Sequence, residues 1–417
     1  MSAVFTRHRL EDLATSVDYG VTASAKNTAI GPLFLRITDI QDDFVDWSTV
    51  PFCDITPSEE ESARLAPGDI VFARTGATTG KSYLLRTCPN RAVFASYLIR
   101  VRPRQSCVDP RYLAWYFQTP EYWRQITSSS AGSAQPGVNA SKLKALTVPL
   151  PDFPEQRRIA DILDKADAIR RKRKQAIALT DQLLRSTFLE MFGDPVTNPK
   201  GWPSVPVESI AKVEKNALAI GPFGSNLLSS DYRAAGHPVI FVRDIVSGSF
   251  HWKSKVFVND EKFMELAAHR AVPGDVLITK MGDPPGVACV LPTEFPDSII
   301  TADVVKVSAN RALIHPEYLA TMINSPFCQE QIGRISAGIT RQKMTLRDFR
   351  QLEIRLPPLS EQSRYLGFVR RFERLRDHLK AAERDAQTLF SSLVDRAFRG
   401  ELSRLEQVGK QLQMFSK

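Results

Sequence analysis

Two long stretches of the chain carry apolar residues at helical spacing. Steps of three and four residues dominate in both, which predicts two amphipathic helices. Residues 156–192 and 368–399 contain neither Gly nor Pro, and Gly193 and Gly400 are predicted to end the helices. A helix of about 36 residues would be roughly 54 Å long.

The rest of the chain predicts a mixed α+β fold. It is rich in Gly, Pro and short β-branched runs. Pro-Gly-Asp at 67–69 and 273–275 predicts a tight turn that leads into a strand. Asp109-Pro110 and His315-Pro316 predict helix starts with Pro in the first turn. The predicted strands are Leu33–Ile37, Ile70–Arg74, Phe94–Val101, Val239–Val242, Val276–Lys280 and Ile299–Val307.

The chain contains an internal repeat, in which matching residues are separated by one fixed number of positions. Pro67-Gly68-Asp69 recurs 206 residues later as Pro273-Gly274-Asp275. Chance matches would scatter over many offsets, so the sequence predicts two homologous halves. Upstream of Pro67 the register shifts, because Asp39-Ile40 best matches Asp244-Ile245. Further pairs at the same offset are Gly76 and Gly282, Gly80 and Gly286, Pro110 and Pro316, Tyr112 and Tyr318, Leu113 and Leu319, Pro120 and Pro326, Glu155-Gln156 and Glu361-Gln362, and Leu183 and Leu389.

The predicted order is globule, long helix, globule, long helix. A helix with one apolar stripe is not stable alone in water, so we expect the two helices to pair as an antiparallel coiled coil with pseudo-two-fold symmetry. The alternative is that each helix folds back on its own globule. The predicted boundaries are residues 1–150 for the first globule, 151–193 for the central helix, 194–357 for the second globule, 358–402 for the distal helix and 403–417 for a C-terminal tail.

Composition narrows the class of protein. Hydrophobic residues make up 43% of the 417 residues and charged residues 24%, which excludes whole-chain disorder. A net charge of +9 favours an anionic partner, nucleic acid first and a membrane surface second. The five cysteines form no C-x-x-C pair, which argues against disulfides and a zinc site. No signal peptide or transmembrane helix is predicted.

Two motifs resemble enzyme signatures but lack the necessary residues. The loop Gly76–Ser82 has three residues between its glycines, whereas a P-loop needs four to wrap phosphate. Asp283-Pro284-Pro285-Gly286 resembles the Asp-Pro-Pro-Tyr of adenine methyltransferases, but glycine cannot stack on a flipped base. We recognise no nuclease, nucleophile or metal-ligand set, so no catalytic residue and no metal site are predicted.

The chain resembles the specificity (S) subunit of Type I restriction–modification systems. The similarity lies in the stretch from Pro67 to Ser82, the junctions Pro149–Ile159 and Leu356–Gln362, and the ending Ala397–Leu402. It covers essentially the whole chain. It is the order, spacing and duplication of these segments, more than any one motif, that is typical of the family.

The resemblance implies a non-catalytic, cytoplasmic prokaryotic protein that recognises double-stranded DNA. Each globule would be a target-recognition domain for one half of a split, asymmetric site. The helices would set the gap and dock two methyltransferase (M) subunits and, in the full complex, two restriction (R) subunits. This chain would bind no cofactor, because S-adenosylmethionine, ATP and Mg²⁺ would bind to the partners.

Polar loops are the predicted DNA contacts, because cations neutralise phosphates while Arg, Asn and Gln recognise base edges. The stretch 336–343 is the strongest candidate, since it concentrates two cations and a Gln. The cationic run 170–174 is interpreted as a solvated helix face, with contact to DNA or to an acidic M surface as alternatives. Glu155-Gln156 and Glu361-Gln362 are interpreted as first-turn acids and capping groups. The predicted contacts are Arg36, Arg74, Thr78, Thr79, Lys81, Ser133, Gln135, Asn139, Arg243, Lys253, Lys280, Thr340, Arg341, Gln342 and Lys343.

Two alternatives from other classes stay open at this point. One is a self-contained DNA-modifying enzyme with a degenerate motif, which would bind S-adenosylmethionine by itself. The other is a protein-bridging scaffold, for which Arg341→Ala and Lys343→Ala would leave DNA affinity unchanged.

Shortening both long helices by one turn should change the gap between half-sites and leave the half-sites themselves intact, because helix length would set the distance. Methylation-motif sequencing measures both quantities. Altered bases with an unchanged gap would contradict this role for the helices.

Overall fold

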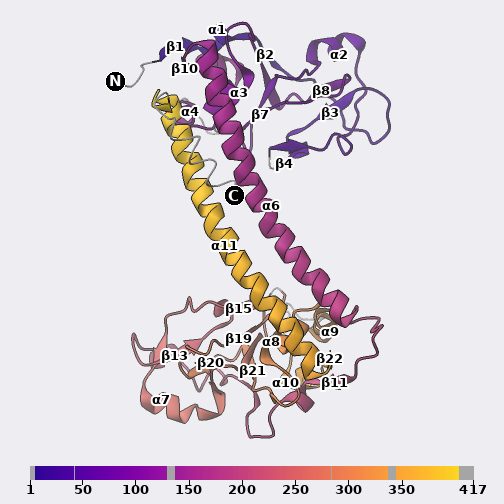
Figure 1. The fold of residues 1–417 in the computed structure, drawn as a ribbon, viewed down its shortest axis with the longest axis vertical. Helices are drawn as coiled ribbons and strands as arrows, with labels where there is room; N and C mark the ends of the chain where they lie inside the picture. The colour runs from indigo at the N-terminus through magenta and orange to yellow at the C-terminus, as the bar shows by residue number, and fades with distance from the viewer. Residues whose placement is uncertain (1–4, 42, 129–136, 283, 337–343, 403–417) are drawn as a thin grey trace. The chain divides into compact units, whose positions relative to one another are not determined.

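The computed structural model describes residues 5–41, 43–128, 137–282, 284–336 and 344–402 (Figure 1). The chain divides into two compact units, residues 1–176 with 379–417 and residues 177–378. Each of the two long helices contributes one part to each unit. The predicted mixed fold with two long helices is confirmed.

In the first unit the elements before the long helix are β1 Thr6–Arg9, α1 Leu10–Leu13, β2 Ala14–Tyr19, β3 Leu33–Leu35, β4 Ile40–Gln41, β5 Phe44–Val45, α2 Pro57–Ala63, β6 Ile70–Ala73, β7 Ser82–Leu84, β8 Ala92–Phe94, β9 Leu98–Pro103, α3 Pro110–Tyr116, α4 Pro120–Ser128, α5 Ala140–Lys144 and β10 Thr147–Leu150.

In the second unit the corresponding elements are β11 Ser204–Pro206, β12 Leu218–Ile220, β13 His237–Ile240, β14 Ile245–Val246, β15 Ser249–Phe250, β16 Phe257–Val258, α7 Asp260–Glu265, β17 Arg270–Ala271, β18 Val276–Thr279, β19 Ala288–Val290, β20 Ser298–Ile300, β21 Val304–Val307, α8 Pro316–Ile323, α9 Pro326–Ser336, α10 Leu346–Arg350 and β22 Glu353–Arg355.

Each unit is built on an antiparallel four-stranded sheet with the same connectivity. The strand order is β2-β9-β6-β7 in the first unit and β12-β21-β18-β19 in the second. The registers also agree, since Ile70 pairs with Val101 and Val276 pairs with Val307. The internal repeat in the sequence is therefore a repeat of structure.

The two Pro-Gly-Asp segments form the predicted turns. Gly68 and Gly274 have φ of 94° and 87°, a conformation that favours glycine. The Asp69 carboxylate accepts the N–H of Ala66 at 2.9 Å, which closes the turn before β6. In the second unit, Asp275 accepts the N–H of Val272 at 3.0 Å.

The prediction of one strand over Phe94–Val101 is wrong. β8 ends at Phe94 and pairs in parallel with β3, whereas β9 begins at Leu98 and joins the four-stranded sheet. Between them the chain turns, with the N–H of Leu98 donating to the Ala95 carbonyl at 2.9 Å. Ile299–Val307 likewise divides into β20 and β21. Both strands of each pair are buried and only three residues separate them, so the two short apolar runs look like one strand in the sequence.

The long helices are α6 Phe153–Phe192 and α11 Leu359–Phe398, each 40 residues long (Figure 1). Gly193, with φ of 76°, follows α6 as predicted and donates to the Leu189 carbonyl at 2.8 Å. α11 begins at Leu359, next to the predicted boundary at residue 358, and passes through Gly367. Glycine costs a helix about 1 kcal/mol, which the burial of neighbouring side chains such as Tyr365 offsets.

Within each unit the two long helices pair antiparallel. In the first unit, Leu163 near the start of α6 shares a hydrophobic core with Leu393 near the end of α11. In the second unit, Phe188 near the end of α6 packs against Tyr365 near the start of α11, with ring centroids 5.5 Å apart. The alternative, in which each helix folds back on its own globule, does not hold for α11.

The end of α11 lies in the core of the first unit. The Phe398 ring is 5.1 Å from the ring of Tyr112 and 5.6 Å from that of Tyr116, both on α3. Phe390 lies 5.5 Å from Trp115 on the same helix. The second half of the sequence therefore completes the fold of the first.

A buried glutamine fixes the start of each long helix. Gln156 is 1% exposed, and its amide oxygen accepts the N–H of Asp109 at 2.9 Å. Its amide nitrogen donates to the carbonyls of Cys107 and Pro151 at 3.2 and 2.9 Å. The glutamine therefore joins the first turn of α6 to the segment that leads into α3, beyond the capping role predicted from sequence.

Gln362 repeats this arrangement in the second unit. It is fully buried, and its amide oxygen accepts the N–H of His315 at 2.9 Å. Its amide nitrogen donates to the carbonyls of Leu313 and Pro357 at 3.1 and 2.8 Å. Both glutamines are thus buried structural groups.

Replacing Gln156 with Leu should destabilise the first unit by about 1 to 3 kcal/mol, because the N–H of Asp109 would be left buried without an acceptor. Urea denaturation followed by circular dichroism measures this. Gln182→Leu, at an exposed position of α6, is the matched control and should change the free energy of unfolding by less than about 0.5 kcal/mol. Equal effects of the two substitutions would contradict the role given to Gln156.

Candidate nucleic-acid interface

One end of the sheet in the first unit brings together several predicted DNA contacts. β2 ends at Tyr19 and β6 ends next to Arg74, while β9 and β7 begin just after Tyr97 and Lys81. Because neighbouring strands of this sheet are antiparallel, these four positions lie at the same end of the sheet. We call Tyr19, Arg74, Lys81, Tyr97 and the adjoining Asn139 the strand-end surface.

Backbone hydrogen bonds hold the strand-end surface together. The N–H of Arg74 donates to the Tyr97 carbonyl at 3.1 Å, and the carbonyl of Arg74 accepts the N–H of Val138 at 3.0 Å. The Tyr19 hydroxyl accepts the N–H of Ala140 at 3.0 Å. These bonds therefore hold the end of β6, the start of β9 and the segment at Val138 together. The bond to Tyr19 adds the end of β2.

The surface combines a cation with exposed aromatic rings. The guanidinium of Arg74 lies 5.0 Å from the centroid of the Tyr19 ring. Tyr19 is 44% exposed and Tyr97 39% exposed. A cation over an aromatic face is attracted by the ring quadrupole, so Tyr19 restrains the Arg74 side chain.

The glycine loop of the first unit is the connection of a β-hairpin, because β6 and β7 pair antiparallel. This agrees with the predicted hairpin-like loop. The hydroxyl of Thr79 donates to the Gly76 carbonyl at 2.7 Å, within the loop. Thr78 is half-buried and Lys81 exposed. Their contact with DNA stays a prediction.

Arg36 and Asn139 both have partners inside the protein. The guanidinium of Arg36 donates to the Asp39 carboxylate at 2.7 Å, and this hydrogen bond raises the pKa of Arg36. The side-chain oxygen of Asn139 accepts the N–H of Lys142 at 2.8 Å and caps α5. Contact with DNA stays a prediction for both.

The second unit has the same backbone frame with different side chains. The N–H of Lys280 donates to the Asp303 carbonyl at 2.7 Å, and the carbonyl of Lys280 accepts the N–H of Met344 at 3.2 Å. Lys280 and Asp303 therefore occupy the places of Arg74 and Tyr97. Lys280 is only 7% exposed, and its ammonium group donates to the Ala302 carbonyl at 3.3 Å.

Arg243 and Lys253 lie around a buried carboxylate. Asp244 is fully buried and accepts the N–H groups of Phe241, Lys253 and Ser254 at 2.8 to 2.9 Å. The Arg243 guanidinium lies 4.4 Å from the centroid of the Phe241 ring and donates to the Ser254 hydroxyl at 2.8 Å. Asp244 thereby orders an exposed loop that carries two of the predicted cations.

The remaining predicted contacts lie outside the described residues: Ser133, Gln135, Thr340, Arg341, Gln342 and Lys343.

The cationic run on α6 is partly engaged within the first unit. Arg170 donates to the Asp167 carboxylate at 2.5 Å and lies 4.9 Å from the centroid of the Phe390 ring. Arg171 donates to Asp167 and to Asp43, at 2.5 and 3.0 Å. The start of this run therefore belongs to the packing between α6 and its neighbours, beyond the solvated face expected from sequence.

The described residues offer no evident site for a metal ion. Within these ranges no group of three or more His, Cys, Asp or Glu side chains is placed to hold one. Burial raises the pKa of the Cys289 thiol to about 12, so the group stays protonated near neutral pH. Over the same ranges no helix combines the length and apolar character that crossing a membrane requires.

Comparison with known proteins shows what this architecture is similar to. Residues 42–179 match the Type I restriction modification DNA specificity domain. The chain is 25% identical to the specificity subunit of the Type I restriction enzyme EcoKI from Escherichia coli K12, over 82% of this chain and 77% of the relative. It is 21% identical to the putative MjaX specificity subunit of Methanocaldococcus jannaschii, over 85% and 83%. The chain is therefore similar to Type I restriction–modification specificity subunits over most of its length, and residues 42–179 match their DNA specificity domain.

The fold agrees with that of a solved family member. The S subunit of a Type I restriction–modification system from M. genitalium superposes with a TM-score of 0.57, at 12% identity, over 94% of this chain and 96% of that one. At this identity the likeness concerns the fold alone.

Sequence reasoning missed Tyr19 and Tyr97. Tyr97 fell inside the segment predicted as one strand, where its side chain had no distinct meaning. The turn between β8 and β9 exposes it. Tyr19 lay in no predicted strand. It reaches the same end of the sheet as Tyr97 because β2 pairs with β9.

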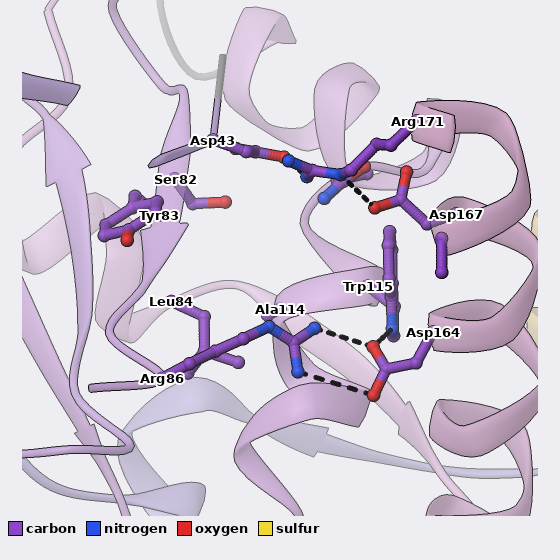
Figure 2. Close-up of a pocket in the computed structure, with 12 residues that line it drawn as sticks. Asp43, Ser82, Tyr83, Leu84, Arg86, Ala114, Trp115, Asp164, Asp167 and Arg171 are labelled. Atoms are coloured by element: carbon purple, nitrogen blue, oxygen red, sulfur yellow. Dashed lines mark hydrogen bonds and ion pairs between the residues drawn. The ribbon is translucent and has the colours of Figure 1, made fainter. Parts of the chain in front are cut away.

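A cavity of about 340 Å³ lies where the sheet and α3 of the first unit meet α6 (Figure 2). Asp164 of α6 accepts hydrogen bonds from Arg86 at 2.6 Å and from the indole N–H of Trp115 at 3.1 Å. Arg111 donates to the same carboxylate at 3.2 Å. The hydrogen bonds that Arg111 donates to the carboxylates of Asp109 and, with a smaller effect, Asp161 raise the pKa of Arg111. These contacts fix the sheet and α3 to the long helix.

Replacing Asp164 with Asn should destabilise the first unit by about 1 to 3 kcal/mol, because three donors lose a charged acceptor. Asp161→Asn is the matched control, since Asp161 pairs with Arg111 alone and is 57% exposed. It should cost under about 1 kcal/mol. Urea unfolding measures both, and equal costs would rule out Asp164 as the main connection.

Proposed function

We propose that this chain is the non-catalytic DNA-recognition subunit of a Type I restriction–modification complex, and that it recognises a bipartite, asymmetric site. The observation that carries the proposal is that two homologous units present different side chains from the same backbone frame. Each unit would contact one half-site of double-stranded DNA through its β-rich part, the recognition domain.

The difference between the units explains the asymmetry. Arg74 and Tyr97 in the first unit correspond to Lys280 and Asp303 in the second. Each base pair presents its own pattern of donors and acceptors in the major groove, so different side chains select different bases. A duplicated scaffold with unlike contact residues therefore recognises two unlike half-sites.

The long helices would set the distance between the half-sites and dock the M subunits. Exposed leucines in the second unit support docking, since Leu179, Leu183 and Leu375 are 55%, 52% and 48% exposed. Contiguous apolar patches on a surface mark protein contacts, and these leucines would form such a patch for M. Two M subunits would methylate adenine, and R subunits would cut.

Catalysis would then belong to the partners. M would bind S-adenosylmethionine and flip the target adenine, and R would use ATP and Mg²⁺. The purified chain is expected to bind none of these. Measurable binding of S-adenosylmethionine by this chain alone would favour the alternative of a self-contained enzyme.

Loss of this gene should abolish N6-methyladenine at one split, asymmetric motif in host DNA, because no other subunit would select that site. Single-molecule methylation sequencing of strains with and without the gene measures this. Reintroducing the intact gene is the control and should restore the motif. Unchanged methylation in a strain that expresses the whole system would falsify the proposal.

A further inference from the structure

Most arginines in the described part of the first recognition domain are neutralised by carboxylates. The partners are Arg7 with Glu121, Arg9 with Glu11, Arg36 with Asp39, Arg64 with Glu61, Arg86 with Asp164, Arg91 with Glu60, Arg100 with Asp18, Arg102 with Asp69, and Arg111 with Asp109.

Arg74 is different. Within the described ranges its guanidinium forms no ion pair with an acid, and it lies instead over the Tyr19 ring. The residue is exposed, at the end of β6. It therefore retains a positive charge that no carboxylate of the described residues compensates.

The contact with Tyr19 suits Arg74 to contact a base edge. Arginine can stack its planar guanidinium on a ring, and a guanidinium held in that way keeps the N–H donors of its plane available for a partner. The ring also limits the conformations of a long side chain, which lowers the entropy lost on binding. The Tyr19 hydroxyl is itself held by the N–H of Ala140.

We propose that Arg74, positioned by Tyr19, recognises a guanine in the major groove of one half-site. Guanine presents its O6 and N7 acceptors there, and the paired donors of arginine fit them in a bidentate contact. This inference rests on the proposed function. Arg74 is the contact residue, and Tyr19 is a positioning residue that acts through it.

The second unit cannot make the same contact at the equivalent position. Lys280 is buried and donates to the Ala302 carbonyl. An ammonium group also lacks the planar pair of donors that guanine selects. The guanine contact should therefore belong to one half-site only.

The test uses the full chain assembled with its M subunit. Methylation sequencing of the wild type first supplies the site, and duplexes are then made with each G·C pair changed in turn to A·T. Wild type should lose about 10- to 100-fold in affinity at one guanine of one half-site. Arg74→Ala should lose discrimination at that guanine and keep it in the other half-site.

Chemical substitution of the same guanine sharpens the test. 7-Deazaguanine removes the N7 acceptor and leaves the remaining groups of the base pair. It should weaken binding by the wild type and leave binding by Arg74→Ala unchanged. Arg74→Lys keeps the charge without the paired donors, and it should also lose discrimination at this position.

Two further variants separate recognition from charge and from folding. Arg104→Ala removes an exposed cation at the opposite end of β9 and should keep full discrimination. Tyr19→Phe keeps the ring and should discriminate like the wild type, whereas Tyr19→Leu should lose much of the preference for guanine. Rescue by Phe distinguishes positioning through the ring from a merely structural role of the residue.

The outcomes distinguish this inference from the function on which it rests. If the wild-type complex recognises no split motif, the proposed function fails and the inference fails with it. If the wild type recognises one but Arg74→Ala keeps its preference at every guanine, only the inference is overturned. A loss of affinity that is equal for all duplexes would identify a phosphate contact and would likewise overturn it.

Discussion

The buried amides of Gln156 and Gln362 are the constraint on which the rest of the structure depends. Each accepts one hydrogen bond and donates two, all with backbone groups at the start of the helix or in the segment before α3 or α8. A buried backbone group without a partner is costly, so each glutamine allows a long helix to begin in only one relation to its unit. The place of that helix then decides which side chains of its stripe enter the core.

The pairing of the helices makes each unit depend on both halves of the sequence. The end of α11 supplies Phe390 and Phe398 to the core of the first unit, against aromatic rings of α3. The end of α6 supplies Phe188 and Phe192 to the core of the second. Neither half of the chain therefore has a complete core without the other, which explains how the apolar side chains near both ends of each 40-residue helix are covered.

Comparison of the two units shows which features recur in both and which differ between them. Turns, sheet order and the glutamine contacts recur in both units, so they are the parts that the fold requires. The strand ends, where Arg74 corresponds to Lys280 and Tyr97 to Asp303, carry different chemistry on the same backbone bonds. Side chains at these ends can change without loss of the core, which under the proposed function would let one architecture select different DNA sequences.

The sequence by itself determined the elements whose signals are local. Helical periodicity predicted the two long helices, and the Pro-Gly-Asp segments predicted two turns. The fixed offset of 206 residues predicted two homologous halves. Each of these signals depends on the residue types in a short segment or on a repeated order of residues, so it can be recognised without knowing the contacts. Tertiary structure decided what depends on distant contacts. It divided Phe94–Val101 between two sheets, buried Lys280, paired Asp164 with three donors, and brought Tyr19 and Tyr97 to the same end of the sheet as Arg74. Each of these follows from which strands pair and which helix covers them, and those choices are made by residues far apart in the sequence.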